Sequence, residues 1–117
     1  MINPKRGEIW LVDLNPTRGQ EIQKTRPVII ISTDIFQKIP LRIIIPITTW
    51  QDKFNSRPFM IKLVANAQNK LNQDSSANVL QVRSISLERF IKKVGHISDD
   101  KLEAILVLLL ICVEYKA

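Results

Sequence analysis

The stretch Glu21-Ile22-Gln23-Lys24-Thr25-Arg26-Pro27-Val28-Ile29-Ile30-Ile31-Ser32 (residues 21–32) joins a polar loop directly to an apolar run. β-Branched residues fill both faces of residues 28–32, which is typical of a central strand covered on both sides. Arg26 stands at the entrance to this strand, and Glu21 lies five residues earlier. An arginine fixed at a strand end presents a planar fork of donors that suits phosphate. An ordinary strand start beside a solvated glutamate would give the same pattern.

Strand patterns flank this run on both sides. Further strands are predicted at residues 7–14, 41–49, 59–64, 79–83 and 90–97. Pro46 lacks an N–H group, so its strand is expected to lie at an edge or to carry a bulge there. Residues 66–78 are rich in Asn, Gln, Ser and Lys, which predicts an exposed, mobile loop.

A single helix is predicted to follow the last strand. Ser98 is a favoured N-cap, and the aspartates at 99 and 100 suit the positive end of a helix dipole. We expect this helix to run to about Tyr115 and, because it is apolar all round, to be buried against the sheet or a second subunit. Six short strands, one helical turn at 33–37 and this helix predict a mainly β (α+β) fold. A curled antiparallel sheet or small barrel in one domain, residues 1–117, is expected.

The composition favours a polyanionic partner. The 117 residues include 17 Lys and Arg against 11 Asp and Glu, a formal net charge of +6, which suits a nucleic acid or an acidic protein segment. The single cysteine, Cys112, lies in the most apolar run and is predicted to be a core residue in a reducing compartment. The N-terminus has no signal-peptide core, and the apolar run 104–113 is too short to span a membrane, so a cytoplasmic protein is expected.

Several chemistries are excluded by residue counts. With one His and one Cys, the sequence offers no cluster of metal ligands, so neither a metal nor another cofactor is predicted. It has no Gly-rich phosphate loop and no Gly-x-Ser-x-Gly motif. His96 is interpreted as structural or solvated. The remaining polar candidates at strand ends are Arg18, Glu21, Arg26, Thr48, Thr49 and Arg83.

Such a set can support cleavage of RNA without a metal. An arginine can neutralise the charge that develops on the phosphate, a hydroxyl can donate to a phosphoryl oxygen, and a carboxylate can accept the 2′-hydroxyl proton. Arg26 is expected to stabilise charge, whereas proton transfer from it stays open because a guanidinium holds its proton tightly. Thr48 can equally be a packing residue of its strand.

Aromatic residues that could stack on bases are few. Trp10, Trp50 and Phe54 are the candidates, although Trp10 fits the core better. Trp50 follows Thr48-Thr49 into a polar loop that carries Lys53, so we expect it to be partly exposed beside the site.

The sequence resembles a known family. Residues 6–21 (Arg-Gly-Glu-Ile-Trp-Leu-Val-Asp-Leu-Asn-Pro-Thr-Arg-Gly-Gln-Glu) resemble the opening of the MazF/PemK-like toxins of bacterial toxin–antitoxin modules. The likeness continues through 25–32, and residues 46–49, 79–85 and 93–98 are also similar. It implies an SH3-like antiparallel barrel (the CcdB/PemK-like fold) acting as a homodimer. It also implies metal-independent, sequence-specific cleavage of single-stranded RNA.

The resemblance also assigns residues. It implies catalytic roles for Arg26 and Thr48, and for Glu21 a role that differs among family members. It implies a cognate antitoxin that lays an acidic segment over a basic groove. Contacts to RNA are expected from Arg18, Thr49, Trp50, Lys53 and Arg83. Residues 50–55 do not follow the family pattern, so the recognised RNA sequence stays open.

Two other functions fit the same fold. One is a non-enzymatic poison that binds DNA gyrase, and the other is a barrel that binds RNA without cutting it. The pairing of Arg26 with Thr48 favours the endoribonuclease, because a poison that binds protein has no need of two groups that hold a phosphate.

Overall fold

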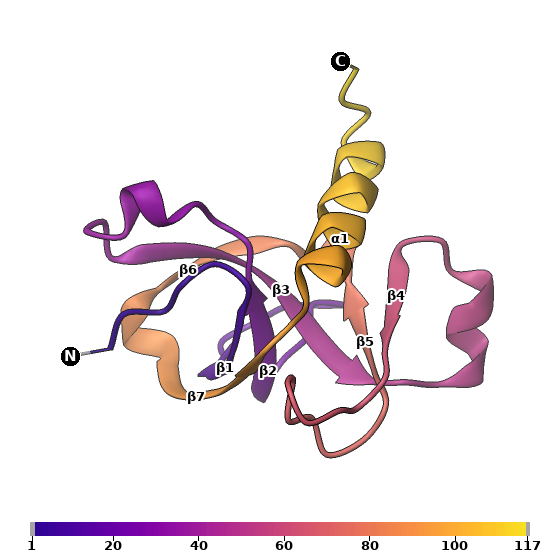
Figure 1. Cartoon of the computed structure of the whole chain (residues 1–117), viewed down its shortest axis with the longest axis horizontal. Helices are drawn as coiled ribbons and strands as arrows, with labels where there is room; N and C mark the ends of the chain where they lie inside the picture. The colour runs from indigo at the N-terminus through magenta and orange to yellow at the C-terminus, as the bar shows by residue number, and fades with distance from the viewer. Residues whose placement is uncertain (1, 117) are drawn as a thin grey trace.

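The computed structural model describes residues 2–116, which form one bent antiparallel sheet with a C-terminal helix on one face (Figure 1). The elements are β1 (Glu8–Asp13), β2 (Thr25–Ile30), β3 (Leu41–Thr49), β4 (Met60–Leu63), β5 (Ser75–Asn78), β6 (Arg83–Ser86), β7 (Phe90–His96) and α1 (Asp99–Cys112). Short 3-10 turns lie at η1 (Asp34–Phe36), η2 (Asp52–Ser56), η3 (Val79–Gln81) and η4 (Leu87–Arg89). The prediction of a mainly β, antiparallel fold ending in a helix is confirmed.

Strand β3 divides the sheet into two parts. The strand order is β4-β5-β3-β2-β1-β7, and β6 also pairs with β3. The first half of β3 pairs with β6 over residues 41–44, and its last residues, 47–49, pair with β5. Because different strands occupy the same side of β3, the sheet bends along it.

Pro46 lies in this central strand and not at an edge of the sheet. The N–H of Ile31 donates to the carbonyl of Ile43 at 3.0 Å, so the peptide groups of odd-numbered β3 residues face β2. Alternation then turns the ring nitrogen of Pro46 away from β2. It falls in the gap between Ile44, where pairing with β6 ends, and Ile47, where pairing with β5 begins. The missing N–H therefore costs no ladder hydrogen bond.

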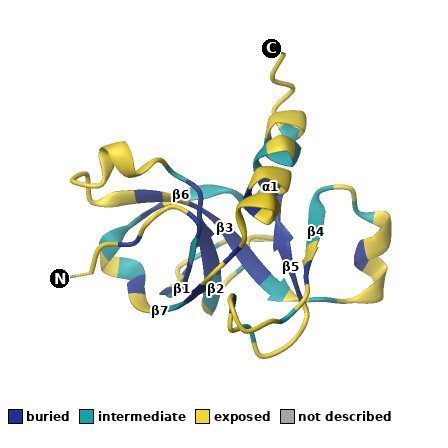
Figure 2. Cartoon of the chain, in the orientation of Figure 1, coloured by how far each residue is buried: buried dark blue, intermediate teal, exposed yellow. Residues whose placement is uncertain are grey.

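The sheet separates two apolar clusters. Along β1, Ile9 joins the cluster under α1, and Trp10 and Val12 join the cluster on the other face, because successive side chains of a strand point to opposite faces. Trp10 packs edge-on against Phe90 with ring centroids 5.8 Å apart, so it is a core residue. Figure 2 shows buried residues along much of β2 and β3, whereas α1 carries exposed residues along its whole length.

Two element predictions between residues 66 and 83 are wrong. Residues 75–78 are not an exposed loop but the strand β5, all four residues of which are buried. The predicted strand 79–83 is largely the turn η3, and the strand β6 forms after it, at 83–86. The apolar residues Val79 and Val82 belong to the core under α1, and a 3-10 turn delivers them there.

The other boundaries differ by a few residues. Strand β2 begins at Thr25 and ends at Ile30, earlier than residues 28–32. Helix α1 begins as predicted, with Ser98 Oγ accepting from the N–H of Lys101 at 3.2 Å. It ends at Cys112, because Glu114 adopts a left-handed conformation with φ of 56°.

Glu8 joins β1 to β7 through its carboxylate. Its Oε2 lies 2.9 Å from Lys93 Nζ, and its Oε1 accepts from Trp10 Nε1 at 3.0 Å and from the N–H of Lys5 at 2.8 Å. Burial opposes ionisation, but the hydrogen bonds from Trp10, Lys93 and Lys5 and the charge of Lys93 outweigh it. The pKa of Glu8 therefore lies below its ordinary value.

We expect Glu8→Gln to lower stability near neutral pH by about 1 kcal/mol, since the ion pair is partly exposed. Because the folded-state pKa is lowered, the ionised carboxylate stabilises the fold fully above its unfolded pKa. This contribution is lost as pH falls through the folded pKa. Urea unfolding of both proteins at several pH values should show their difference shrinking below roughly pH 5. A difference that is independent of pH would contradict the assignment.

Candidate active site

Arg26 and Thr48 line one hollow of about 480 Å³ at the ends of β2 and β3. The two strands are neighbours, and their register sets Val28 opposite Pro46. Continuing that register by two residues places Arg26 across from Thr48. The fold therefore brings together two residues that stand 22 positions apart in the sequence.

The guanidinium of Arg26 is only partly engaged. Its Nε donates to the carbonyl of Gln23 at 3.3 Å, which holds the side chain at the strand entrance. Among the residues that the structure describes, its two Nη groups have no hydrogen-bond partner. They are thus available as a two-donor fork for a phosphate.

The hydroxyl of Thr48 is an unusual buried group. Thr48 Oγ1 is buried and has no hydrogen-bond partner within residues 2–116. An unpaired buried hydroxyl costs about 1–3 kcal/mol, and an isolated case at a cleft calls for an explanation. Because Thr48 lines the hollow, rotation about χ1 would turn its hydroxyl toward the hollow, where a bound ligand could pair with it.

The opposite wall of the hollow is basic. It comes from the loop before β5 and from β7, and includes Lys70, Lys92 and Lys93. None of the described residues that line the hollow is acidic. Lys93 is paired with Glu8, so the unpaired positive charge of the hollow comes from Arg26, Lys70 and Lys92 among the described residues. A hollow of this kind attracts an anion.

The loop that forms this wall has a fixed shape. Asn66 Oδ1 accepts from the N–H groups of Gln68 and Asn69, at 2.9 Å and 2.8 Å. Asn69 is 4% exposed; its Oδ1 accepts from the N–H groups of Asn66 and Leu71, and its Nδ2 donates to Val64 O at 2.9 Å. These side chains replace strand partners for the loop backbone.

Two further contacts attach the loop to the sheet. Gln73 Nε2 donates to Thr49 Oγ1 at 2.9 Å, beside the hollow. At Gly95 of β7, a Cβ would lie 2.6 Å from Asn69 O and 2.7 Å from Gln68 O, both backbone atoms. Only glycine allows the loop to pack this closely against β7.

Glu21 lies outside the hollow. Its Oε1 accepts from the N–H of Arg18 at 2.6 Å, and its own N–H donates to Arg18 O at 3.1 Å, so the carboxylate closes a turn of the loop before β2. Gln81 holds the same loop, accepting from Ile22 N at 3.0 Å and donating to Gln20 O at 2.8 Å.

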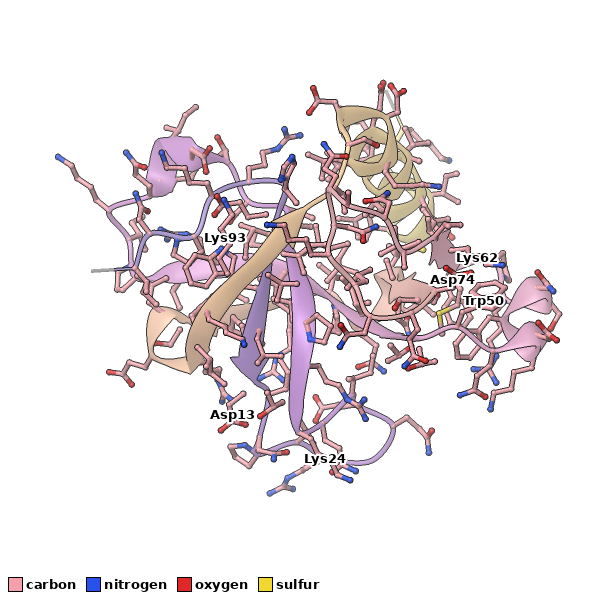
Figure 3. All side chains as sticks on the ribbon, turned by 60° about the horizontal axis from the view of Figure 1, so that its bottom comes forward. Asp13, Lys24, Trp50, Lys62, Asp74 and Lys93 are labelled. Atoms are coloured by element: carbon pink, nitrogen blue, oxygen red, sulfur yellow. The ribbon has the colours of Figure 1, made fainter. Side chains whose placement is uncertain are left out.

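The remaining predicted RNA contacts are dispersed. Thr49 lines the hollow, whereas Arg83 donates to Leu14 O at 3.4 Å. Trp50 packs edge-on against Phe54, with centroids 5.7 Å apart, and Lys62 Nζ lies 5.1 Å from the centre of its ring. Figure 3 shows Trp50 beside Lys62, away from Lys93.

The two stacking candidates in this aromatic cluster, Trp50 and Phe54, differ in their exposure. Phe54 is 6% exposed, so the expectation that it stacks on bases is wrong in this structure. Trp50 is half-buried, as expected. Lys53 lies over the ring of Phe54, with its Nζ 6.0 Å from the ring centroid.

Sequence reasoning missed several residues that line the hollow. No local motif marks Lys70, Asn72, Gln73 or Lys92, because long-range packing brings them beside Arg26. The adjacent lysines at 92 and 93 in a predicted strand were the available signal.

Two features are absent from the described residues. Within residues 2–116, no group of three or more His, Cys, Asp or Glu side chains is arranged to hold a metal ion. Over the same range, no helix is both long enough and apolar enough to cross a membrane.

The fold and the hollow define a small β protein with a basic hollow at its strand ends. Residues 5–112 match the family described as the PemK-like, MazF-like toxin of type II toxin-antitoxin system, and the chain belongs to this family. The predicted resemblance is thereby confirmed.

Individual relatives agree with this assignment. The chain is 35% identical over 104 residues to endoribonuclease MazF9 of Mycobacterium tuberculosis, covering 84% of this chain and 86% of the relative. Its fold matches MazF of Deinococcus radiodurans with a TM-score of 0.83 at 19% identity, over 97% and 99% of the two chains. A mycobacterial endoribonuclease in complex with its cognate antitoxin matches with a TM-score of 0.75 at 14% identity, over 97% and 98%.

Proposed function

We propose that residues 1–117 form one toxin domain that cuts single-stranded RNA at specific sequences, without a metal ion. The observation that carries this proposal is the meeting of Arg26 and Thr48 in one basic hollow whose described lining has no carboxylate. The relative MazF9 is named an endoribonuclease, which agrees with this reading.

In the proposed reaction, the 2′-oxygen of the RNA attacks the neighbouring phosphorus. The bond to the 5′-oxygen breaks, which leaves a 2′,3′-cyclic phosphate and a 5′-hydroxyl. Arg26 donates its free Nη groups to the phosphoryl oxygens and stabilises the charge that grows there. Thr48, turned into the hollow, donates to one of these oxygens, and Lys70 and Lys92 hold the strand by its charge.

Two proton transfers complete this mechanism. Glu21 is the proposed base for the 2′-hydroxyl, but its carboxylate first has to leave the N–H of Arg18. The 5′-oxygen requires a proton as it leaves, and Arg26 is the proposed donor. We propose that Arg18, Thr49, Trp50, Lys53 and Arg83 contact the RNA on either side of the cut.

We also propose an acidic antitoxin as the partner that blocks this hollow. The net charge of +6 and the basic hollow suit an extended acidic segment as well as RNA. Both partners would be met in the cytoplasm, where RNA and antitoxin are made.

Incubating the protein with a long natural RNA in EDTA tests the proposed function. We expect cuts at a short recurrent sequence, with cyclic phosphate ends, and no cuts in DNA of the same sequence. Uncut RNA together with inhibition of gyrase would favour the poison, and RNA that is bound but left intact would favour the non-catalytic barrel.

A homodimer through α1 is the proposed assembly. One face of the helix packs Leu102 and Ile105 into the core, while Val107, Leu110 and Ile111 remain 44–66% exposed on the other. The C-terminal end of α1 projects beyond the sheet (Figure 1). An apolar face of this kind is typical of a subunit contact.

We expect Ile111→Glu to convert a dimer into monomers, because it places a charge in the proposed contact. Light scattering over a range of protein concentrations measures this. Ile35→Glu, at the 83% exposed Ile35 of η1, is the matched control and should leave the mass unchanged. A wild-type protein that stays monomeric at high concentration would refute the dimer.

A further inference from the structure

A second hollow of about 370 Å³ adjoins the one that holds Arg26 and Thr48. The loop residues Ala67 and Gln68 line it on one side, and Gly95 and His96 of β7 on the other. The two hollows share Lys70, Lys93 and Val94, so they follow one another along the same wall.

Positive charge in the first hollow is followed by uncharged hydrogen-bonding groups in the second. No acidic residue lines either hollow among the described residues. Lys93 is neutralised by Glu8, whereas Lys70 is exposed at the boundary and forms no ion pair within residues 2–116. The order is therefore a cationic site at Arg26, a cation at Lys70, and then the polar pair of the second hollow.

That polar pair is preassembled. Gln68 Nε2 and His96 Nε2 lie 3.0 Å apart, and the N–H of His96 donates to Gln68 O at 3.2 Å. Gly95 permits this approach, because a Cβ there would overlap the loop backbone. Both side chains are exposed, so they are open to a ligand from solvent.

These groups suit a nucleobase. A glutamine amide offers a donor beside an acceptor, which matches the edge of a base, and an imidazole can stack on an unstacked base. An acidic peptide would need cations along the whole wall, whereas here the cations are followed by neutral hydrogen-bonding groups, as a phosphate of an RNA strand is followed by a nucleoside with its base. The observations therefore favour RNA over a protein segment as the occupant.

We propose that Gln68 and His96 form a base-recognition subsite next to the cleavage site, and that Lys70 binds the phosphate between the two. The proposal rests on the proposed RNA cleavage at Arg26. It assigns part of the sequence preference to residues that line no part of the first hollow. A good base contact of this kind discriminates about 10- to 100-fold between bases.

Short RNAs that contain the mapped cut site test the proposal. They are shortened by one nucleotide at a time from each end, and each position is changed to the other bases. For the wild-type protein, kcat/KM should fall about tenfold or more when the nucleotide in the second hollow is removed or replaced. Gln68→Ala and His96→Ala should still cut the shortest RNA but should no longer respond to that nucleotide.

Two further variants sharpen the test. Gln68→Glu keeps the size but replaces the amide donor with an acceptor, so it should shift the preference toward cytosine, whose N4 donates. Lys70 has a φ of 54°, which Asn tolerates, so Lys70→Asn removes the charge without strain and should lower kcat/KM more for RNAs that reach past it than for the shortest RNA.

Lys24→Asn is the matched control. Lys24 is also exposed with a φ of 70°, and Figure 3 shows it at the far end of the sheet from Lys93. This variant loses the same charge from the same backbone conformation outside both hollows. It should keep the wild-type response to the subsite nucleotide.

Each outcome decides the proposal. Variants at Gln68 and His96 that respond to length and base as the wild type does would overturn the subsite while leaving RNA cleavage intact. Variants that change only inhibition by the antitoxin would assign this wall to the protein partner and overturn it as well. If the wild-type protein cuts no RNA at all, the proposed function fails and the subsite fails with it.

Discussion

Replacing Arg26 with alanine is expected to lower kcat/KM for RNA cleavage by about a thousandfold and to leave the fold intact. Loss of one preorganised donor costs about 10²–10³ in kcat, and Arg26 supplies a fork of two. The loss should lie in kcat more than in KM, because these hydrogen bonds strengthen as charge develops in the transition state. Initial rates on a short RNA in EDTA, at several RNA concentrations, measure both constants.

Two companion variants make the result specific. Arg26→Lys keeps the charge but loses the planar fork, so its activity should lie between those of the wild type and the alanine variant. Arg6→Ala removes an exposed arginine that does not line the hollow and should cut RNA at the wild-type rate. Wild-type cleavage by Arg26→Ala would remove this residue from the mechanism.

Replacing Arg42 with methionine is expected to destabilise the fold by about 3–5 kcal/mol. Arg42 is 4% exposed in β3 and its guanidinium is held by oxygen atoms alone. The acceptors, within 2.7–3.1 Å, are the carbonyls of Pro4, Gln37, Ile39 and Leu41 and Asn3 Oδ1. Methionine fills similar space but leaves these oxygens unpaired, and each such loss costs about 1–3 kcal/mol.

Urea unfolding monitored by tryptophan fluorescence measures this change. Arg42→Lys should lie between methionine and the wild type, because it keeps the charge with fewer donors in a different geometry. Arg57→Met is a control at a half-buried arginine that packs on the Phe54 ring at 5.2 Å, and it should cost about 1 kcal/mol or less. An Arg42→Met protein as stable as the Arg57 variant would show that these contacts contribute little.

The elements that the sequence predicts well are those in which apolar side chains carry the pattern. The strand pattern at residues 7–14 predicts β1, and the β-branched run 28–32 predicts β2. Strand β5 escapes prediction because its residues, Ser-Ser-Ala-Asn, have the composition of a loop. Small side chains let it lie buried between β3 and β4, so its position depends on neighbours that no local window contains.

The residues of the site also differ in whether the local sequence or only long-range packing identifies them. Arg26 and Thr48 could be named from the sequence, and the structure brings them into one hollow, although their catalytic roles stay predictions. Glu21 also stays a prediction, and its carboxylate closes a local turn instead of facing Thr48. Lys70 and Lys92 could not be named, because only the packing of the 66–73 loop against β7 brings them to the same wall.

The asparagines of that loop have a consequence for how such a protein can change its target. Asn66 and Asn69 define the path of the backbone through hydrogen bonds within the loop, and Gly95 provides its seat. The side chains of the exposed residues Gln68 and Lys70 form none of these hydrogen bonds within the loop. Substitutions at these two positions can therefore alter the groove with little cost to folding, so the loop is an exchangeable cassette on which new RNA preferences can evolve or be engineered.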